Sequence, residues 1–416
     1  MTARERAQLV LAFAKTLYIH GQATEQTVNT SERLAVALGL RAAVRPRGGE
    51  IRVVGDWANG PPAIEAAAAP TAVQMERVAA AMLAIDDVAS SRLTADAAET
   101  AIERIARLPP SPDWMFALAA AAGAAALAVI FGVDHVFAAT LIFISAGLGA
   151  ALRRALGRMS ANLFLQPFAA ALLAGVVGAL AVRYDLSSSL RLVAVCPCMV
   201  LVPGPHFLNG ALDLATGRVA LGVARLVYAG LIVVAICVGL LVGLALLGVS
   251  LPADPAGRDI PLWQDVIAAG VAVAAYSVFF STPLRMLPWP VAVGMLAHSL
   301  RWTAIACLGF GAAAGALVAC IAVALILTPV ARRTHMPFAA IGFASVVSMI
   351  PGLYLFRAAS GVVQLVAHAP PASGLLAATV GDGLTAAFIL LAMCVGLIVP
   401  KMAIDQFSDF RARAKA

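Results

Sequence analysis

The 416-residue chain is 62% apolar and only 12% charged, a balance that is not found in soluble globular domains. The composition therefore indicates a membrane protein. The net charge of +7 lies entirely after residue 108, among apolar segments, where positive charge usually sets membrane orientation. No nucleic-acid partner is indicated.

The first 108 residues differ from the rest, with twelve acidic and twelve basic side chains. Apolar residues at helical spacing predict two amphipathic helices, around residues 9–17 and 28–38. The turn Gly48-Gly49 between "RAAVRP" and "EIRVVGD" predicts a β-hairpin, and residues 72–91 and 94–108 return to a helical period. The start of the chain has no pattern of a cleavable signal peptide. We therefore expect residues 1–108 to form a small cytoplasmic α+β domain, followed by a Pro-rich boundary.

Ten later segments are long enough to cross a hydrocarbon layer of about 30 Å, which takes about 20 helical residues. The expected spans are Trp114–Phe131, Val136–Leu152, Asn162–Val182, Leu190–Leu212, Val219–Leu247, Trp263–Phe280, Val291–Ala306, Leu308–Val330, Phe338–Ala359 and Leu375–Val399. With both termini in the cytoplasm, twelve Lys and Arg side chains lie on the inner side and four on the outer side, as the positive-inside rule favours. The predicted fold class is mainly α, a polytopic membrane protein.

Two Pro-Gly dipeptides interrupt apolar segments at an interval of 148 residues, at Pro203-Gly204 and at Pro351-Gly352. Fifty residues before each proline stands an arginine, Arg153 and Arg301, which keeps the same interval. Five spans separate equivalent points, so the repeats 109–250 and 251–416 enter the membrane with opposite orientations, the plan of many secondary transporters. Because proline leaves backbone groups unpaired, the interrupted helices should face each other and not the lipid.

Polar residues after each break are candidates for substrate binding. His206 and Asn209 follow Pro203, and Arg357 stands six residues after Pro351, as Asn209 does after Pro203. The planar guanidinium of Arg357 suits a carboxylate, although the side chain is also placed to reach the outer surface. We expect the substrate to contact these three side chains together with the two Pro-Gly segments.

Two carboxylates are candidates for proton coupling. Asp213 lies ten residues after Pro203, where a carboxylate is costly unless it is paired or hydrated. The alternative for Asp213 is an ion pair with Arg218 or Arg225. Asp382, in "GDGLT", is the second candidate, and its flanking glycines are equally typical of a loop. The repeat places Gly361 at the position equivalent to Asp213.

Cys196-Pro197-Cys198 resembles the metal-translocating site of heavy-metal P-type ATPases, and such thiolates suit a soft ion. The chain lacks the phosphorylation motif of those pumps and any P-loop, so primary active transport and a metal site are not expected. The spacing of the six cysteines predicts no structural disulfide. Motifs of hydrolases are absent from the sequence, and we expect neither an enzyme nor a cofactor.

Two segments resemble the threonine/serine exporter family: "LVPGPHFLNGALDLATGRVALGVAR", with its partner "IPG", and "HGQATEQTVNTSERLAVALGL" near the start. The resemblance covers nearly the whole chain. It implies an inner-membrane exporter of small hydrophilic metabolites that is driven by the proton gradient. Because relatives with the two parts on separate chains are associated with dicarboxylate export, family membership leaves the substrate open.

The function we expect is therefore proton-coupled export of threonine and serine, with dicarboxylate export as the alternative. A passive channel and a membrane scaffold or sensor remain alternatives of other classes. The expected partners are a small-molecule substrate, protons and membrane lipid, and the sequence leaves the oligomeric state open.

Overall fold

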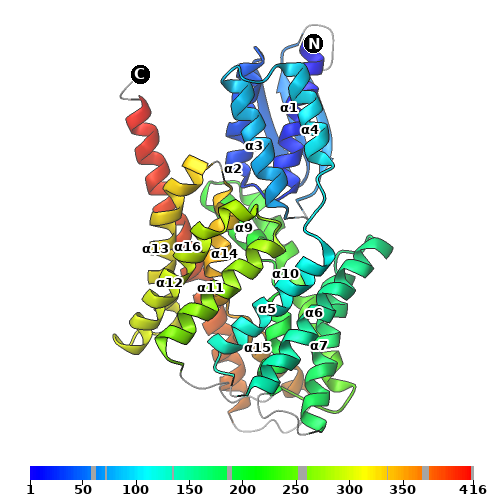
Figure 1. Ribbon diagram of the computed structural model, residues 1–416, viewed down its shortest axis with the longest axis vertical. Helices are drawn as coiled ribbons and strands as arrows, with labels where there is room; N and C mark the ends of the chain where they lie inside the picture. The colour runs from blue at the N-terminus through cyan, green and yellow to red at the C-terminus, as the bar shows by residue number, and fades with distance from the viewer. Residues whose placement is uncertain are drawn as a thin grey trace.

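The computed structural model describes residues 1–57, 62–70, 73–133, 135–184, 190–251, 260–334, 336–367 and 374–413. A small unit of four helices and a sheet lies at one end of the long axis, and the remaining helices fill the rest of the molecule (Figure 1). Buried apolar side chains form one cluster within the small unit and a second among the other helices. Ala23, Met75 and Ala79 of the small unit belong to the second cluster, so the two units are packed together.

The amino-terminal unit contains α1 (Ala3–Ile19), α2 (Thr24–Ala37), β1 (Ala42–Arg47), β2 (Gly49–Gly55), β3 (Ala63–Ala68), α3 (Met75–Ala89) and α4 (Ala95–Ala106). The predicted helices and the hairpin are confirmed. Thr2 and Glu5 form a capping box that fixes the start of α1. Gly49 takes a φ of +119° in the hairpin turn, a conformation that favours glycine.

The third strand was not predicted from the sequence. β3 pairs antiparallel with β2, which gives the sheet order β1-β2-β3. Its sequence "AIEAAA" is rich in alanine, which favours a helix when no partner is present. The hydrogen bonds to β2 decide its conformation instead.

The membrane part contains α5 (Asp113–Ile130), α6 (Val136–Met159), α7 (Leu165–Arg183), α8 (Leu190–Met199), α9 (Gly204–Ala215), α10 (Val219–Ala245), α11 (Leu262–Phe279), η1 (Leu284–Met286), α12 (Pro288–Ala306), α13 (Ala312–Thr334), α14 (Phe338–Val346), η2 (Val347–Met349), α15 (Gly352–Ala367) and α16 (Leu375–Arg413). α16 extends toward the end of the molecule that holds the amino-terminal unit (Figure 1). The protein is a multi-pass membrane protein.

The expected count of ten spans is not reached among the described residues. Seven helices are long and apolar enough to cross a membrane, and two bent helix pairs bring the number to nine. α12 forms at the expected seventh span but does not meet the same standard, because Pro288, His298 and Arg301 lower its hydropathy.

The helices of the two halves pack with corresponding partners. In the first half α7 packs against α6, α8 and α10, and in the second half α13 packs against α12, α14 and α16. The half-helices start at the same interval, since α9 begins at Gly204 and α15 at Gly352, 352 − 204 = 148. Between the halves, α5 packs against α11, α9 against α14, and α8 against α15.

Glycines allow α7 and α10 to approach closely. A Cβ atom at Gly243 would overlap the carbonyl oxygen of Leu172 and lie 3.0 Å from the Cα atom of Gly175. We expect Gly243→Ala to lower the free energy of unfolding by about 1–3 kcal/mol, as overpacking does. Thermal unfolding of the purified protein in detergent measures this.

Gly230→Ala in the same helix is the matched control, because a Cβ atom there would meet no described atom within 4 Å. We expect this variant to unfold at or slightly above the temperature of the unmodified protein. Equal melting temperatures for the two variants would show that the close approach of α7 and α10 does not limit stability.

Candidate functional site

Both Pro-Gly segments interrupt a membrane helix, and both do so with the same local geometry. α8 and α9 are bent by 54°, and the α14–η2 segment and α15 by 59°. At each break the glycine N–H donates to the carbonyl two residues earlier, Gly204 to Val202 at 2.9 Å and Gly352 to Ile350 at 2.8 Å. Pro203 has φ −82° and ψ 62°, the values of an inverse γ-turn.

The two breaks contact each other, as expected from the sequence. A Cβ atom at Gly204 would overlap the ring of Phe343 in α14, and one at Gly352 would lie 2.7 Å from Met199 in α8. The Tyr276 hydroxyl donates to the carbonyl oxygen of Met199 at 3.0 Å. An apolar cavity of only about 20 Å³ remains beside the first break. Protein therefore covers the interrupted backbone, and the space between the breaks is closed.

The polar face of α9 meets the amino-terminal unit at the turn between α1 and α2. The Asn209 Nδ2 atom donates to the carbonyl oxygen of Gly21 at 3.0 Å, and the Thr24 hydroxyl donates to Asp213 Oδ2 at 3.0 Å. Gly21 adopts a φ of +100° in this turn, which brings its carbonyl to α9. The segment that resembled an exporter motif thus binds the segment after the first Pro-Gly.

Asp213 also pairs with Arg225 of α10. The Arg225 Nε atom lies 3.5 Å from Asp213 Oδ2, and the side chains are only 5% and 2% exposed. The Arg225 guanidinium lies over the ring of Tyr18 in α1, 5.1 Å from the centroid. The ion pair that was the alternative expectation for Asp213 is present, and both units enclose it.

Three buried polar atoms at this pair have no hydrogen-bond partner among the described residues. They are Asn209 Oδ1, an acceptor, and Arg225 Nε and Nη2, both donors, of which Nε faces Asp213 only at the ion-pair distance of 3.5 Å. Buried polar atoms are usually hydrogen-bonded, so an orphaned donor and acceptor near one carboxylate are unusual. A ligand that carries both a carboxylate and an ammonium group has the complementary atoms.

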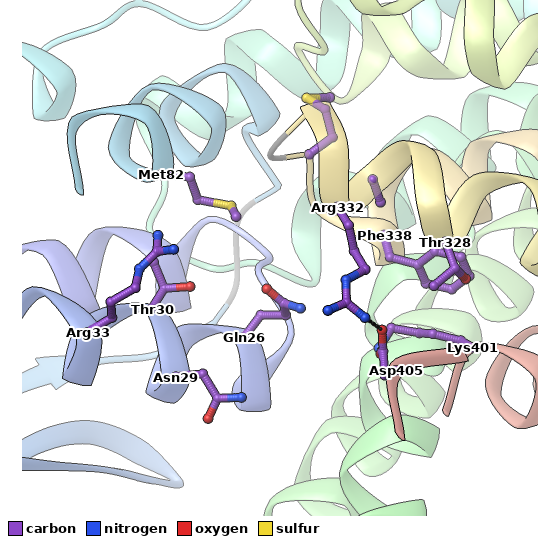
Figure 2. Close-up of a pocket in the computed structure, with 12 residues that line it drawn as sticks. Gln26, Asn29, Thr30, Arg33, Met82, Thr328, Arg332, Phe338, Lys401 and Asp405 are labelled. Atoms are coloured by element: carbon purple, nitrogen blue, oxygen red, sulfur yellow. Dashed lines mark hydrogen bonds and ion pairs between the residues drawn. The ribbon is translucent and has the colours of Figure 1, made fainter. Parts of the chain in front are cut away.

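The amino-terminal unit and the second half border an open cavity of about 270 Å³ (Figure 2). Gln26, Asn29, Thr30, Arg33 and Met82 form one wall, and Thr328, Ala331, Arg332, Met336, Phe338, Lys401 and Asp405 the other. Figure 2 shows Gln26 and Arg332 reaching toward each other from opposite walls.

A second, small cavity beside Asp213 shares two lining residues with this space. Asp213 and Thr24 line a cavity of about 10 Å³, which shares Gln26 and Lys401 with the cavity of Figure 2. The large cavity is therefore adjacent to Asp213, and Gln26 and Lys401 stand between them.

Arg357 and Asp382 form a separate ion pair, with 2.9 Å between Arg357 Nε and Asp382 Oδ2. Arg357 lies in α15, the helix that follows the second Pro-Gly, and Asp382 lies in the next helix, α16. In the first half the charges are exchanged, because the helix after the Pro-Gly carries the carboxylate and α10 carries the arginine. The structure does not bring this pair together with Asp213.

His206 lies within electrostatic reach of Arg225, whereas the Cys-Pro-Cys segment lies in α8, which supplies no member of either ion pair. His206 is buried and contacts the ring of Tyr228 edge-on, with 5.3 Å between the centroids. Cys196 and Cys198 are fully buried in α8, which Pro197 does not end. In the part of the chain that the structure describes, no group of three His, Cys, Asp or Glu side chains could hold a metal ion.

Sequence reasoning missed a buried hydrogen-bonded chain in the second half. His298 of α12 contacts Asp265 of α11 and Ser348 of η2. The signal available was an ionisable residue within each of two apolar segments, "LWQDV" and "MLAHSL". The roles of Gly21 and Thr24 as partners of α9 had no such signal.

The amino-terminal unit is attached to the second half as well. The N–H groups of Met75 and Glu76 at the start of α3 donate to the carbonyl oxygens of Phe280 and Ser281, both at 3.0 Å. The Ser111 hydroxyl also lies 3.0 Å from that of Ser281. The unit therefore binds α9 in one half and the residues after α11 in the other.

His20, at the end of α1, makes the stability of the amino-terminal unit sensitive to acid. Burial, and then the nearby Arg77 guanidinium, lower the pKa of His20 from 6.5 to about 4. The unfolded chain binds the proton more readily, so folding stability is lost as pH falls from about 6.5 toward 4. The loss is on the order of 3 kcal/mol for this shift.

We expect His20→Gln to flatten the pH dependence of thermal unfolding between pH 6.5 and 4. Melting temperatures of the two proteins, measured in the same detergent across this range, check the expectation. Parallel pH profiles for the two proteins would contradict the assignment to His20.

Comparisons with known proteins agree with the residues that resembled the exporter family. Residues 8–247 match the family model described as "Putative threonine/serine exporter", and residues 265–403 match the model "Threonine/Serine exporter, ThrE". The chain is 25% identical over 370 residues to a "Probable threonine/serine exporter" of Mycobacterium tuberculosis, an alignment that covers 85% of this chain and 69% of the relative. No solved structure matches the chain. The chain therefore belongs to the threonine/serine exporter family.

Proposed function

We propose that this protein exports threonine and serine across the inner membrane in exchange for protons, with both termini in the cytoplasm. Family membership supports the substrates, and the distribution of positive charge in the sequence supports the orientation. The cavity of Figure 2 then lies on the cytoplasmic side, where an exporter collects its substrate.

Residues 1–108 act as a cytoplasmic domain, and residues 109–250 and 251–416 as two inverted five-helix repeats. The corresponding packing of α7 and α13, and the reciprocal contacts of α8 with α15 and of α9 with α14, support this division. Because each repeat has an odd number of spans, the second repeat enters the membrane from the side opposite to the first, and the two repeats are inverted. Rocking of one repeat against the other would expose the space between the breaks to each side in turn.

The substrate passes from the large cavity to the polar face of α9. The observation that carries this proposal is the set of buried atoms without a hydrogen-bond partner beside Asp213, namely Asn209 Oδ1 and the Nε and Nη2 atoms of Arg225. Arg225 would bind the substrate carboxylate, and Asn209 and Asp213 its ammonium group.

From the polar face of α9 the solute moves between the two breaks. In this proposal Pro203, Gly204 and His206 would line the opened path in the first half, and Pro351 and Gly352 would line it in the second. Backbone groups freed at the breaks contact the substrate when the space opens. Arg357 receives the carboxylate at the outer end.

Proton coupling is assigned to Asp213 or Asp382. Each carboxylate faces an arginine, Arg225 or Arg357, that stabilises its charged form. A substrate carboxylate that binds the arginine weakens this stabilisation, so proton uptake and substrate binding become linked.

One observation favours dicarboxylate export as a second candidate function. The lining of the large cavity carries three cations, Arg33, Arg332 and Lys401. Asp405 pairs with Arg332 and Lys401, and Asp86 pairs with Arg33, which leaves one positive charge in excess. A solute with two negative charges suits such a surface better than a zwitterion does.

Reconstitution into proteoliposomes tests the proposal. With an imposed proton gradient, we expect labelled threonine to accumulate against its own gradient. Counterflow with unlabelled threonine, serine and succinate then ranks the substrates, and strong counterflow with succinate alone would select the second candidate. Movement of threonine only down its gradient would contradict proton-coupled export and favour a channel.

A further inference from the structure

Asp265, His298 and Ser348 form a buried chain of ionisable and hydroxyl groups in the membrane part. His298 Nδ1 lies 2.9 Å from Asp265 Oδ2, and His298 Nε2 lies 2.6 Å from Ser348 Oγ. Asp265, His298 and Ser348 are 3%, 0% and 2% exposed. A neighbouring carboxylate and a second partner on the opposite ring nitrogen fix the orientation of the imidazole.

These three groups resemble a catalytic triad in spacing, but their burial argues against acyl transfer. A nucleophilic serine must reach a substrate carbonyl, and Ser348 is enclosed on all sides in this conformation. An intramembrane histidine paired with a carboxylate is instead typical of proton relays in transporters.

The surroundings of His298 hold few other charges. The helices packed against α12 carry Asp265 and Tyr276 in α11, Arg285 in η1, and Cys320, Arg332 and Arg333 in α13, and α12 itself carries Arg301. Tyr354 of α15 acts electrostatically on Arg301. Arg301 acts electrostatically on Asp265. Neutral His298 therefore leaves the group Asp265, His298 and Arg301 without net charge, and protonated His298 gives it one positive charge.

Protonation of His298 changes the hydrogen bonds of the second broken helix. Neutral His298 donates its Nδ1–H to Asp265 and accepts the Ser348 hydroxyl proton at Nε2. When Nε2 takes a proton from water, it becomes a donor, and Ser348 Oγ must accept. The Ser348 hydroxyl proton must then turn to another acceptor. Ser348 stands three residues before Pro351, so this change occurs next to the second break.

We propose that His298, held between Asp265 and Ser348, is a proton-carrying site and transmits its protonation to the second break through Ser348. The inference rests on the proposed function and adds a site to Asp213 and Asp382. An N–H bond forms at Nε2 with a proton from the outer water and breaks when the proton leaves to the cytoplasm. The added positive charge favours an arrangement in which water reaches His298, so the two protonation states prefer different conformations.

The test compares proton-driven uptake with counterflow in proteoliposomes of the full chain. For His298→Gln we expect the ratio of uptake under a proton gradient to threonine counterflow to fall at least ten-fold, because glutamine cannot take up the proton. His135→Gln is the matched control, since His135 is exposed before α6, and its ratio should stay within two-fold of the unmodified protein. An unchanged ratio and pH profile in His298→Gln would overturn the inference.

Ser348→Ala keeps the inference testable if His298→Gln does not fold. This variant removes one hydrogen bond and no charge, and we expect the pH midpoint of coupled transport to shift by at least half a unit. An unchanged midpoint would overturn the role of Ser348 and with it the proposed transmission. If the unmodified protein shows counterflow without proton-driven uptake, the proposed function itself fails, which separates that result from a failure at His298.

Discussion

Asp213→Asn is expected to lower threonine export more than ten-fold and to lower the melting temperature of the purified protein. The substitution keeps the shape of the side chain but leaves Arg225 buried without its counter-charge. Removal of one partner from a buried ion pair typically costs about 3–5 kcal/mol. Export from proteoliposomes and thermal unfolding in detergent measure the two effects.

The double variant Asp213→Asn/Arg225→Gln distinguishes loss of the charge pair from loss of the carboxylate. With both charges removed, we expect most of the stability to return while export stays low. Asp87→Asn is the surface control, because the exposed pair of Asp87 with Arg92 contributes at most about 1 kcal/mol. Equal instability of the single and double variants would show that Arg225 does not depend on Asp213.

Gly204→Ala is expected to abolish export, because the added methyl group overlaps the Phe343 ring where the two breaks meet. Both residues are buried, so Phe343 or the backbone of α9 must move. Overpacking of this kind costs about 1–3 kcal/mol, and here it also separates the two breaks. Initial rates of threonine counterflow in proteoliposomes measure the effect.

Phe343→Leu in the same chain provides the rescue. A smaller side chain opposite the added methyl group should restore part of the export that Gly204→Ala loses. Gly381→Ala in α16 is the control, since a Cβ atom there would meet no described atom within 4 Å. Transport by Gly204→Ala at the rate of the unmodified protein would contradict a functional contact between the breaks.

Local patterns were sufficient for most of the elements and for the position of both breaks. The Pro-Gly dipeptides at Pro203 and Pro351 are local turn signals. Proline alone does not decide the break, because Pro197, Pro329 and Pro400 stand inside α8, α13 and α16 without ending them. The Gly48-Gly49 turn and the apolar stripe of α1 are equally local signals. β3 was not predicted, because its conformation depends on hydrogen bonds to β2 and not on its own residues.

The contacts of the candidate site could not be predicted, because their partners are far apart in the sequence. Thr24 and Asp213 are 189 residues apart, Gly21 and Asn209 are 188 apart, and His298 and Ser348 are 50 apart. From the sequence, a carboxylate at Asp213 was expected to be costly to bury without a partner, and Arg225 was named as one possible partner. That prediction was possible because Arg225 lies in the next helix along the chain. Which residues of the amino-terminal unit meet α9 depends on how two separately packed units dock.

The amino-terminal unit is attached to both halves of the membrane part. It holds α9 of one half through Gly21 and Thr24, and the residues after α11 of the other through Met75 and Glu76. If the halves turn against each other during transport, as proposed, a rigid unit cannot keep both sets of hydrogen bonds, so one set must break in each cycle. A ligand that stiffens this unit would then slow export. If that ligand also changes the affinity for the substrate, thermodynamic linkage requires the substrate to change the affinity for the ligand by the same factor.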